Sequence, residues 1–180
     1  MREAEIRRDA DSCRRETGEG GESRERHKCS CEFPPRDVGR DMAIMDAGTK
    51  RYMLRHFIAA LAYRGSNVLG GTPIPVADFR THANVRTPRE ILNHVNGVLM
   101  YAHSFVTPYE STVPELAAWS TEVERFFKML ELLDASFATN DTIRDVNEER
   151  LLQGPLADAM LHLGQIGIIR RMAGAPVAAE

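Results

Sequence analysis

A run of large apolar residues between positions 119 and 137, spaced alternately by four and three, constrains the fold of this chain more than any other feature. The run consists of Trp119, Val123, Phe126, Leu130, Leu133 and Phe137. Because an α-helix has 3.6 residues per turn, this spacing places all six side chains along one stripe. A helix with such a stripe buries it against neighbouring helices. We therefore expect a bundle helix that begins near Thr112, at the start signal Thr-Val-Pro-Glu, and ends near Ala138.

Three further segments have helical patterning and clear boundary signals. The second one has the strongest start, because Thr87 supplies an N-cap hydroxyl, Pro88 suits the first helical position and Glu90 completes a capping box. Gly154-Pro155 is expected to open the last helix, and Arg170 and Arg171 are expected to close it with cations that suit a helix C-terminus. The three predicted helices span about 50–69, 88–106 and 154–171.

No segment alternates apolar and polar residues over a strand length, so strands are not expected. The long segment 70–86, which opens with Gly-Gly-Thr-Pro-Ile-Pro, has no periodicity and is expected to connect the first two helices. The predicted fold class is therefore all-α, a four-helix bundle over residues 46–180 with a long first connection.

The first 45 residues differ in composition from the rest. Residues 1–40 hold ten basic and ten acidic residues and only nine apolar ones, which is too little apolar surface to offset the entropy cost of ordering. We expect a disordered charged tail, and Met42 or Met45 could equally be the natural start. All three cysteines, Cys13, Cys29 and Cys31, lie in this tail. Their odd number and close spacing fit neither a disulfide framework nor a structural zinc site.

Charge and hydropathy narrow the classes of partner. The net charge of −3 comes without a basic stripe, so nucleic acid is not expected as a partner. No apolar run is long and pure enough for a membrane span, and no leader pattern follows the early arginines. We therefore expect a soluble, cytoplasmic protein that acts on a small molecule.

Three polar residues share one face of the otherwise apolar last helix. Asp158, His162 and Gln165 are spaced by four and three residues, and rotations of about 400° and 700° place them on the same side. His94 in the second helix lies four residues before Val98 and belongs to, or borders, the apolar stripe. Two imidazoles and a carboxylate inside one bundle need a partner, because an unpaired buried charge costs several kcal/mol.

A divalent metal ion would supply that partner. Imidazole nitrogen and carboxylate oxygen bind zinc, nickel, manganese and iron, and three protein ligands leave one coordination position open. Water bound there would have its pKa lowered towards ~7, and a thiol would be held as thiolate. Gln165 is the candidate catalytic residue, which either orients a ligand or binds substrate. The alternative is structural: Asp158 suits the first turn of a helix, and His162 could be a hydrogen-bonded core residue.

The sequence also resembles a known family. His94 in the second helix, followed by Asp-Ala-Met-Leu-His-Leu-Gly-Gln-Ile at 158–166 and Arg-Arg-Met-Ala-Gly-Ala-Pro at 170–176, is similar to the DinB/YfiT-like superfamily over about residues 49–177. The resemblance implies a metal-binding four-helix bundle, with His94, Asp158 and His162 as ligands, and a homodimer. Asp158 stands where the commonest form has histidine, and Leu163 replaces the usual arginine.

What the resemblance implies about function is broad. The family includes thiol-dependent transferases and isomerases, which use bacillithiol or mycothiol, and metal-dependent hydrolases. We expect a divalent metal, zinc or nickel first and manganese or iron next, that activates a low-molecular-weight thiol or water towards a small substrate. Two alternatives stay open. The ligand set also suits a non-haem iron oxygenase, and the metal could instead stabilise a non-enzymatic dimeric binding or stress-response module.

Other candidate residues are given lesser roles. His103, nine positions after His94, is expected to be exposed on the opposite side of its helix, and His56 is expected at the surface. His82 in the long connection is a candidate fourth ligand or general base.

Overall fold

The computed structural model describes residues 47–108, 112, 114–139 and 142–177. The described residues form helices and no strand, which confirms the all-α class. No helix among them is long and apolar enough to cross a membrane. The predicted disordered tail and its three cysteines lie outside the described residues.

Seven helical elements follow one another along the described chain. They are α3 (Ala47–Leu69), α4 (Ile74–Ala77), α5 (Pro88–Ser104), α6 (Trp119–Ala138), α7 (Glu148–Leu151), the π-helical turn η2 (Leu152–Leu156) and α8 (Ala157–Met172). The last three form one continuous helical segment, α7–η2–α8. The one-turn helix α4 lies within the connection that we predicted to be irregular.

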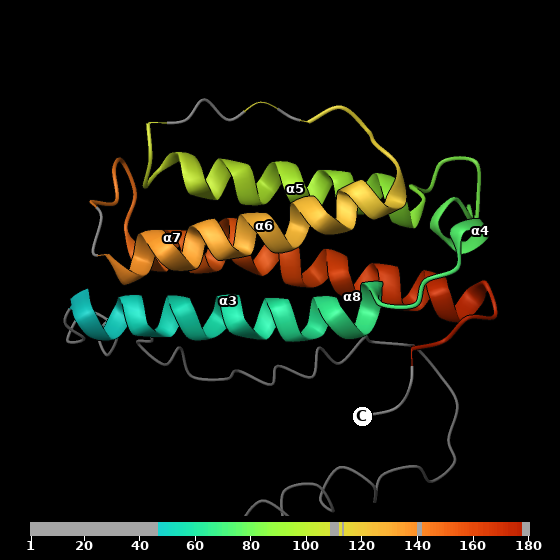
Figure 1. Cartoon of the computed structure of the whole chain (residues 1–180), viewed down its shortest axis with the longest axis horizontal. Coiled ribbons are helices and arrows are strands. Elements are labelled where there is room, and N and C mark those ends of the chain that lie inside the picture. The colour runs from blue at the N-terminus through green and yellow to red at the C-terminus, as the bar shows by residue number, and fades with distance from the viewer. Residues whose placement is uncertain (1–46, 109–111, 113, 140–141, 178–180) are drawn as a thin grey trace, which may run out of the picture. The chain divides into compact units, whose positions relative to one another are not determined.

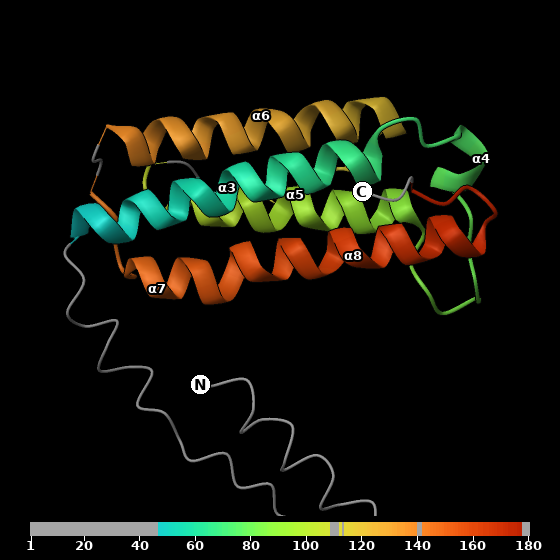
Figure 2. The ribbon, with the colours of Figure 1, turned by 90° about the horizontal axis from the view of Figure 1, so that it is seen from below.

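The four long helical segments lie side by side around one core (Figures 1 and 2). Both α5 and α3 pack against α6 and α8. Asn93 near the start of α5 donates a hydrogen bond to Glu122 near the start of α6 (3.2 Å), so these two helices run in the same direction. The start of α6 therefore lies at the end of the bundle at which α5 begins.

The predicted apolar stripe of α6 forms the centre of this core. Phe126, Leu130, Leu133 and Phe137 are buried, and Trp119 and Val123 are half-buried against them. The other helices contribute Leu54, Ile58, Leu61, Ile91, Leu92, Val95, Leu99, Leu156, Ala159, Leu163 and Ile166, all buried. The alternating spacing in α6 thus identified the core correctly, because a stripe that wide has no other place to be buried.

The predicted helix boundaries are partly confirmed. The capping box forms as expected, since Thr87 Oγ1 accepts the Glu90 N–H (3.2 Å) and Glu90 Oε2 accepts the Thr87 N–H (2.8 Å). The start of α6 was predicted wrongly: the helix begins at Trp119 and not near Thr112. The side chain of Asn93 donates to the carbonyls of Pro114 and Glu115, which holds this backbone outside the helix.

The last helical segment also starts earlier than expected. It begins at Glu148 and not at Gly154, because Asn147 supplies an N-cap whose side chain accepts the Arg150 N–H (2.9 Å). Pro155 lies inside the helical segment and not at its start. Proline has no N–H for an α-helical bond, and the widened π turn accommodates it there.

Arg170 joins the ends of the first and last long helices. Its side chain is buried, and its guanidinium donates to the carbonyls of Val68 and Gly70 at the end of α3 and to that of Ala175. This arrangement satisfies carbonyl groups that a helix C-terminus leaves without partners. The sequence predicted only that Arg170 suits the C-terminus of its own helix, and its bonds to the end of α3 were not predicted.

Candidate metal centre

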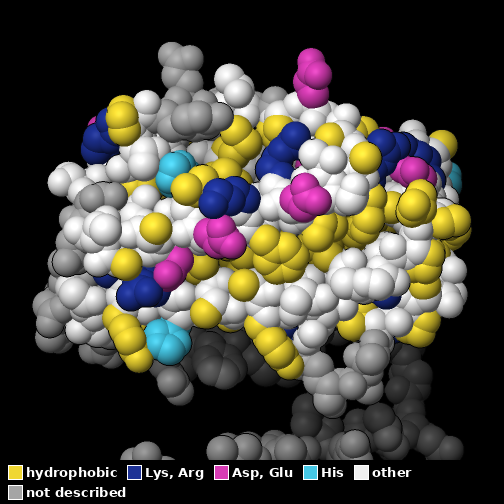
Figure 3. All heavy atoms as spheres, in the orientation of Figure 1, with side chains coloured by type: hydrophobic (Ala, Val, Ile, Leu, Met, Phe, Trp, Pro, Cys, Tyr) yellow, Lys and Arg dark blue, Asp and Glu magenta, His cyan; other side chains and the backbone are white. Residues whose placement is uncertain are grey.

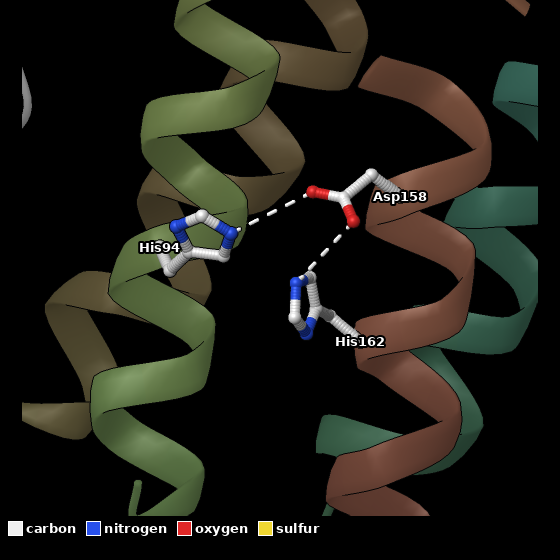
Figure 4. A group of neighbouring side chains, drawn as sticks. All are labelled: His94, Asp158 and His162. Atoms are coloured by element: carbon white, nitrogen blue, oxygen red, sulfur yellow. Dashed lines mark ion pairs between the residues drawn. The ribbon is translucent and has the colours of Figure 1, made fainter. Parts of the chain in front are cut away.

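Three of the predicted site residues come together in the groove between α5 and α8. His94 lies on α5, and Asp158 and His162 lie one turn apart on α8. Figure 4 shows the three side chains pointing towards one another across the two helices. Their potential ligand atoms all lie within 4.8 Å of one another, which makes this the candidate metal site among the described residues.

The separations between these side chains fit a shared ion better than direct hydrogen bonds. His94 Nε2 lies 3.6 Å from Asp158 Oδ2, and His162 Nε2 lies 3.5 Å from Asp158 Oδ1. Two ligand atoms on a tetrahedral ion at ~2.0–2.1 Å are about 3.3–3.4 Å apart. The two imidazole rings stand edge to face, with centroids 4.7 Å apart.

Gln165 contacts the site through His162. Its Oε1 lies 2.8 Å from His162 Nδ1. An amide oxygen only accepts hydrogen bonds, so Nδ1 carries the proton and the lone pair of the neutral ring is on Nε2. That nitrogen is the one near Asp158. Partners of this kind commonly orient metal-binding histidines.

The electrostatic surroundings favour a neutral His94. Burial lowers its pKa below the usual 6.5, and the neighbouring His162 and Arg86 lower it further, while Asp158 acts in the opposite direction. A metal binds the neutral imidazole, so a lowered pKa reduces competition from protons.

The triad is more exposed than expected. The side chains of His94 and Asp158 are 38% and 44% exposed, whereas His162 is 15% exposed. The prediction that the three side chains lie inside the bundle was therefore wrong for His94 and Asp158, whereas His162 is largely enclosed. The outer side of α8 also carries apolar residues, so its composition did not indicate which face is buried: Leu161, Ile168 and Met172 are all exposed. Burial alone does not require a metal here, but solvent and small molecules can reach the site.

The other histidines within the described ranges, His56, His82 and His103, lie apart from the triad. The prediction for His103 was wrong, because this residue is buried, with Nδ1 3.3 Å from Thr107 Oγ1. Chain 142–146 packs back onto this end of α5, where the Arg144 N–H donates to the Phe105 carbonyl. His82 is exposed and is not part of the triad, and His56 is exposed on α3 as expected.

Sequence reasoning missed a buried carboxylate between α5 and α6. Glu122 is fully buried and accepts hydrogen bonds from Asn93, Asn96, Arg125 and the Ala117 N–H. The partners are protein groups at both helix starts, which indicates a structural role. The signal was present in the two asparagines three residues apart on α5, but only the packing of α5 on α6 identifies their partner.

Another hollow lies between α3 and α6. It has a volume of about 560 Å³ and is mostly apolar, with an ion pair between Arg55 and Asp134 (2.8 Å) at its edge. Figure 3 shows that hydrophobic side chains gather over α6 and along its border with α3. Among the described residues no metal-ligating cluster forms there.

Comparisons with protein-family models, curated proteins and solved structures gave no match. The DinB/YfiT-like family, the homodimer and the cytoplasmic location therefore stay predictions from the sequence.

Proposed function

We propose that this chain is a divalent-metal-dependent protein of the DinB/YfiT-like type, which activates a thiol or water for transfer to, or hydrolysis of, a small substrate. The observation that carries the proposal is the convergence of His94, Asp158 and His162 from two helices to within 4.8 Å. Two imidazoles and one carboxylate are an ordinary donor set for zinc, nickel, manganese and iron. Zinc or nickel is the first choice.

The arrangement of helices supports the family part of the proposal. One ligand comes from the second long helix and two come from the last, as the family pattern requires. The four long helical segments enclose one core, to which α5 and α8 contribute their apolar sides. The departures at Asp158 and Leu163 leave the donor set intact, since Asp158 supplies an oxygen and Leu163 is buried in the core.

Partial exposure of the triad favours a reactive site over a closed structural one. Structural zinc sites usually have four protein ligands, whereas catalytic sites leave a position for water or substrate. Here three side chains converge, and two of them are more than one third exposed. When bound, the metal would supply an acidic position at which water or a thiol loses its proton more readily.

Each residue of the candidate site then has a definite role. His94 and His162 would hold the ion together with Asp158, which lies between them with one oxygen towards each ring, and Gln165 would fix the orientation of His162. Asp158 also carries the negative charge that offsets part of the charge of the ion. A low-molecular-weight thiol is the proposed cosubstrate in the transferase form.

Elemental analysis of the purified protein tests the proposal. We expect about one zinc or nickel ion per chain in the wild type and less than one tenth of that in His94→Ala, Asp158→Ala and His162→Ala. His56→Ala, at an exposed histidine on α3, is the matched control and should retain full metal content. A panel of low-molecular-weight thiols should then raise the melting temperature of the metal-loaded wild type only.

Three outcomes distinguish the proposed function from its alternatives. Full metal content in all three variants would overturn the proposal. Iron with oxygen-dependent turnover would favour the oxygenase chemistry that the same ligands allow. Loss of metal that lowers only the melting temperature, with no thiol binding and no turnover, would favour a structural role for the ion.

A further inference from the structure

The groove between α5 and the last helical segment continues from Asp158 along α5 towards the C-terminal end of α5. It has a volume of about 480 Å³ and lies between α5 and the η2–α8 segment. Asp158 forms part of its wall. A molecule bound through the candidate metal centre would therefore extend directly into this groove.

The walls of this groove are mostly apolar, and the polar residues among them are the candidate ligand Asp158 and the uncharged Gln153. Val98 and Tyr101 line it from α5, at four and seven residues after His94, and Leu161 lines it from α8. Tyr101 is 51% exposed and Leu161 is 69% exposed, which is high for large side chains of this kind. The Tyr101 ring is held edge to face against Phe105, with centroids 4.8 Å apart. No basic residue lines this part of the groove, so an uncharged group fits it best.

The π-helical turn keeps the groove open. Gly154 and Pro155 both lie in η2 and line the groove. A Cβ atom added at Gly154 would meet no atom within 4 Å, so a larger side chain there would project into open space. Turns of this type often occur at functional sites, where they displace the backbone of one helical turn. Here the turn ends one residue before Ala157 and two before the ligand Asp158.

Charged groups mark the far end of the apolar section. Beyond Gly154 the groove continues into a more polar hollow lined by Arg150 and Asp145. Arg150 precedes Asp158 by eight residues, which corresponds to about 12 Å along a helix. The apolar section is therefore about as long as one aromatic ring with a short linker.

From this geometry we propose that the substrate of the metal centre has an uncharged aromatic body, which lies between Tyr101, Leu161 and Gly154 while its polar head binds the metal. This inference rests on the proposed function and specifies its substrate class. It makes Tyr101, Leu161 and Gly154 the residues that determine specificity.

Two metal-binding probes of different size test the inference. Benzohydroxamic acid and acetohydroxamic acid share the same chelating head and differ in the phenyl ring. Calorimetric titration of the zinc-loaded full-length protein should show that benzohydroxamic acid binds at least tenfold more tightly. Gly154→Leu should remove this preference while metal content and affinity for acetohydroxamic acid stay the same. Gly164→Leu is the matched control, because Gly164 is exposed on α8 with open space around it and does not line the groove.

Leu161→Ser provides a second variant that does not depend on how the π turn tolerates substitution. It should reduce the preference for benzohydroxamic acid at least threefold at unchanged metal content. Equal affinity of the two probes for the metal-loaded wild type would overturn this inference and leave the proposed function standing. A preference that persists unchanged in both groove variants would also overturn it. Failure of the wild type to hold metal would overturn the proposed function and the inference together.

Discussion

Substitution of Gln165 by alanine isolates the contact that orients His162. The 2.8 Å bond from His162 Nδ1 to Gln165 Oε1 is the contact of this amide with the site, and the residue is exposed. Removal of such a partner typically weakens metal affinity 10–100-fold, or about 1.4–2.7 kcal/mol. The stability of the metal-free protein should change by less than about 0.5 kcal/mol, because no buried contact is lost.

Competition with a chromophoric chelator measures the zinc affinity, and urea unfolding of the metal-free protein measures stability. Gln165→Glu should retain most of the affinity, because a carboxylate also accepts from Nδ1. Gln153→Ala, at an exposed glutamine of η2, is the matched control and should leave the affinity unchanged. The reasoning would be refuted if Gln165→Ala bound zinc within threefold of the wild type, or if Gln153→Ala weakened it equally.

Three further predictions concern the scaffold. A Cβ atom at Gly65 would lie 2.4 Å from Phe126 Cε1, so Gly65→Ala should lower the free energy of unfolding by about 1–2 kcal/mol even after its gain in helix propensity. Gly164→Ala, in open space, should instead raise the free energy of unfolding by up to about 1 kcal/mol. If urea unfolding showed that both variants change the free energy of unfolding in the same direction, this packing argument would be contradicted. Arg170→Met should cost about 2–4 kcal/mol, since two carbonyls at the end of α3 lose a charged donor; an unchanged melting temperature would show that this tie contributes nothing. Burial lowers the pKa of His103 below the usual 6.5. The contribution of neutral His103 to stability is therefore complete above pH 6.5 and is lost as the pH falls through the lowered value. His103→Gln should flatten the dependence of the free energy of unfolding on pH between 7 and 5, and equal slopes in the wild type and the variant would contradict this prediction.

Helical patterning predicted the core better than the helix ends. The stripe of α6 was identified from spacing alone, because six large apolar groups on one side of a helix must pack against other helices. The start of α6 was missed, because Thr112-Val113-Pro114-Glu115 has the composition of a helix start. What prevents a helix there is the side chain of Asn93 from another helix. Such a contact between distant segments has no local signature.

The sequence predicted which three candidate ligands come together, but it did not predict how exposed they are. Spacing placed Asp158, His162 and Gln165 on one face, and the structure brings His94 to that face. Whether a polar residue at the edge of an apolar stripe points inward or into a groove depends on how two helices pack. The position of His103 was wrong for the same reason, because chain 142–146 returns to pack against the end of α5.

Because the candidate ligands lie on two segments that are distant in sequence, the metal site can be completed only after these segments have come together during folding. Along the sequence, the rest of α5, then α6, α7 and η2 lie between His94 and Asp158. In the unfolded chain only the pair on α8 is close together, so a complete site forms once α8 docks on α5. An ion bound there would close a long loop and stabilise α8 in its docked position on α5. Amide hydrogens of α8 should then exchange more slowly with deuterium after loading, while those at the centre of α6 change little.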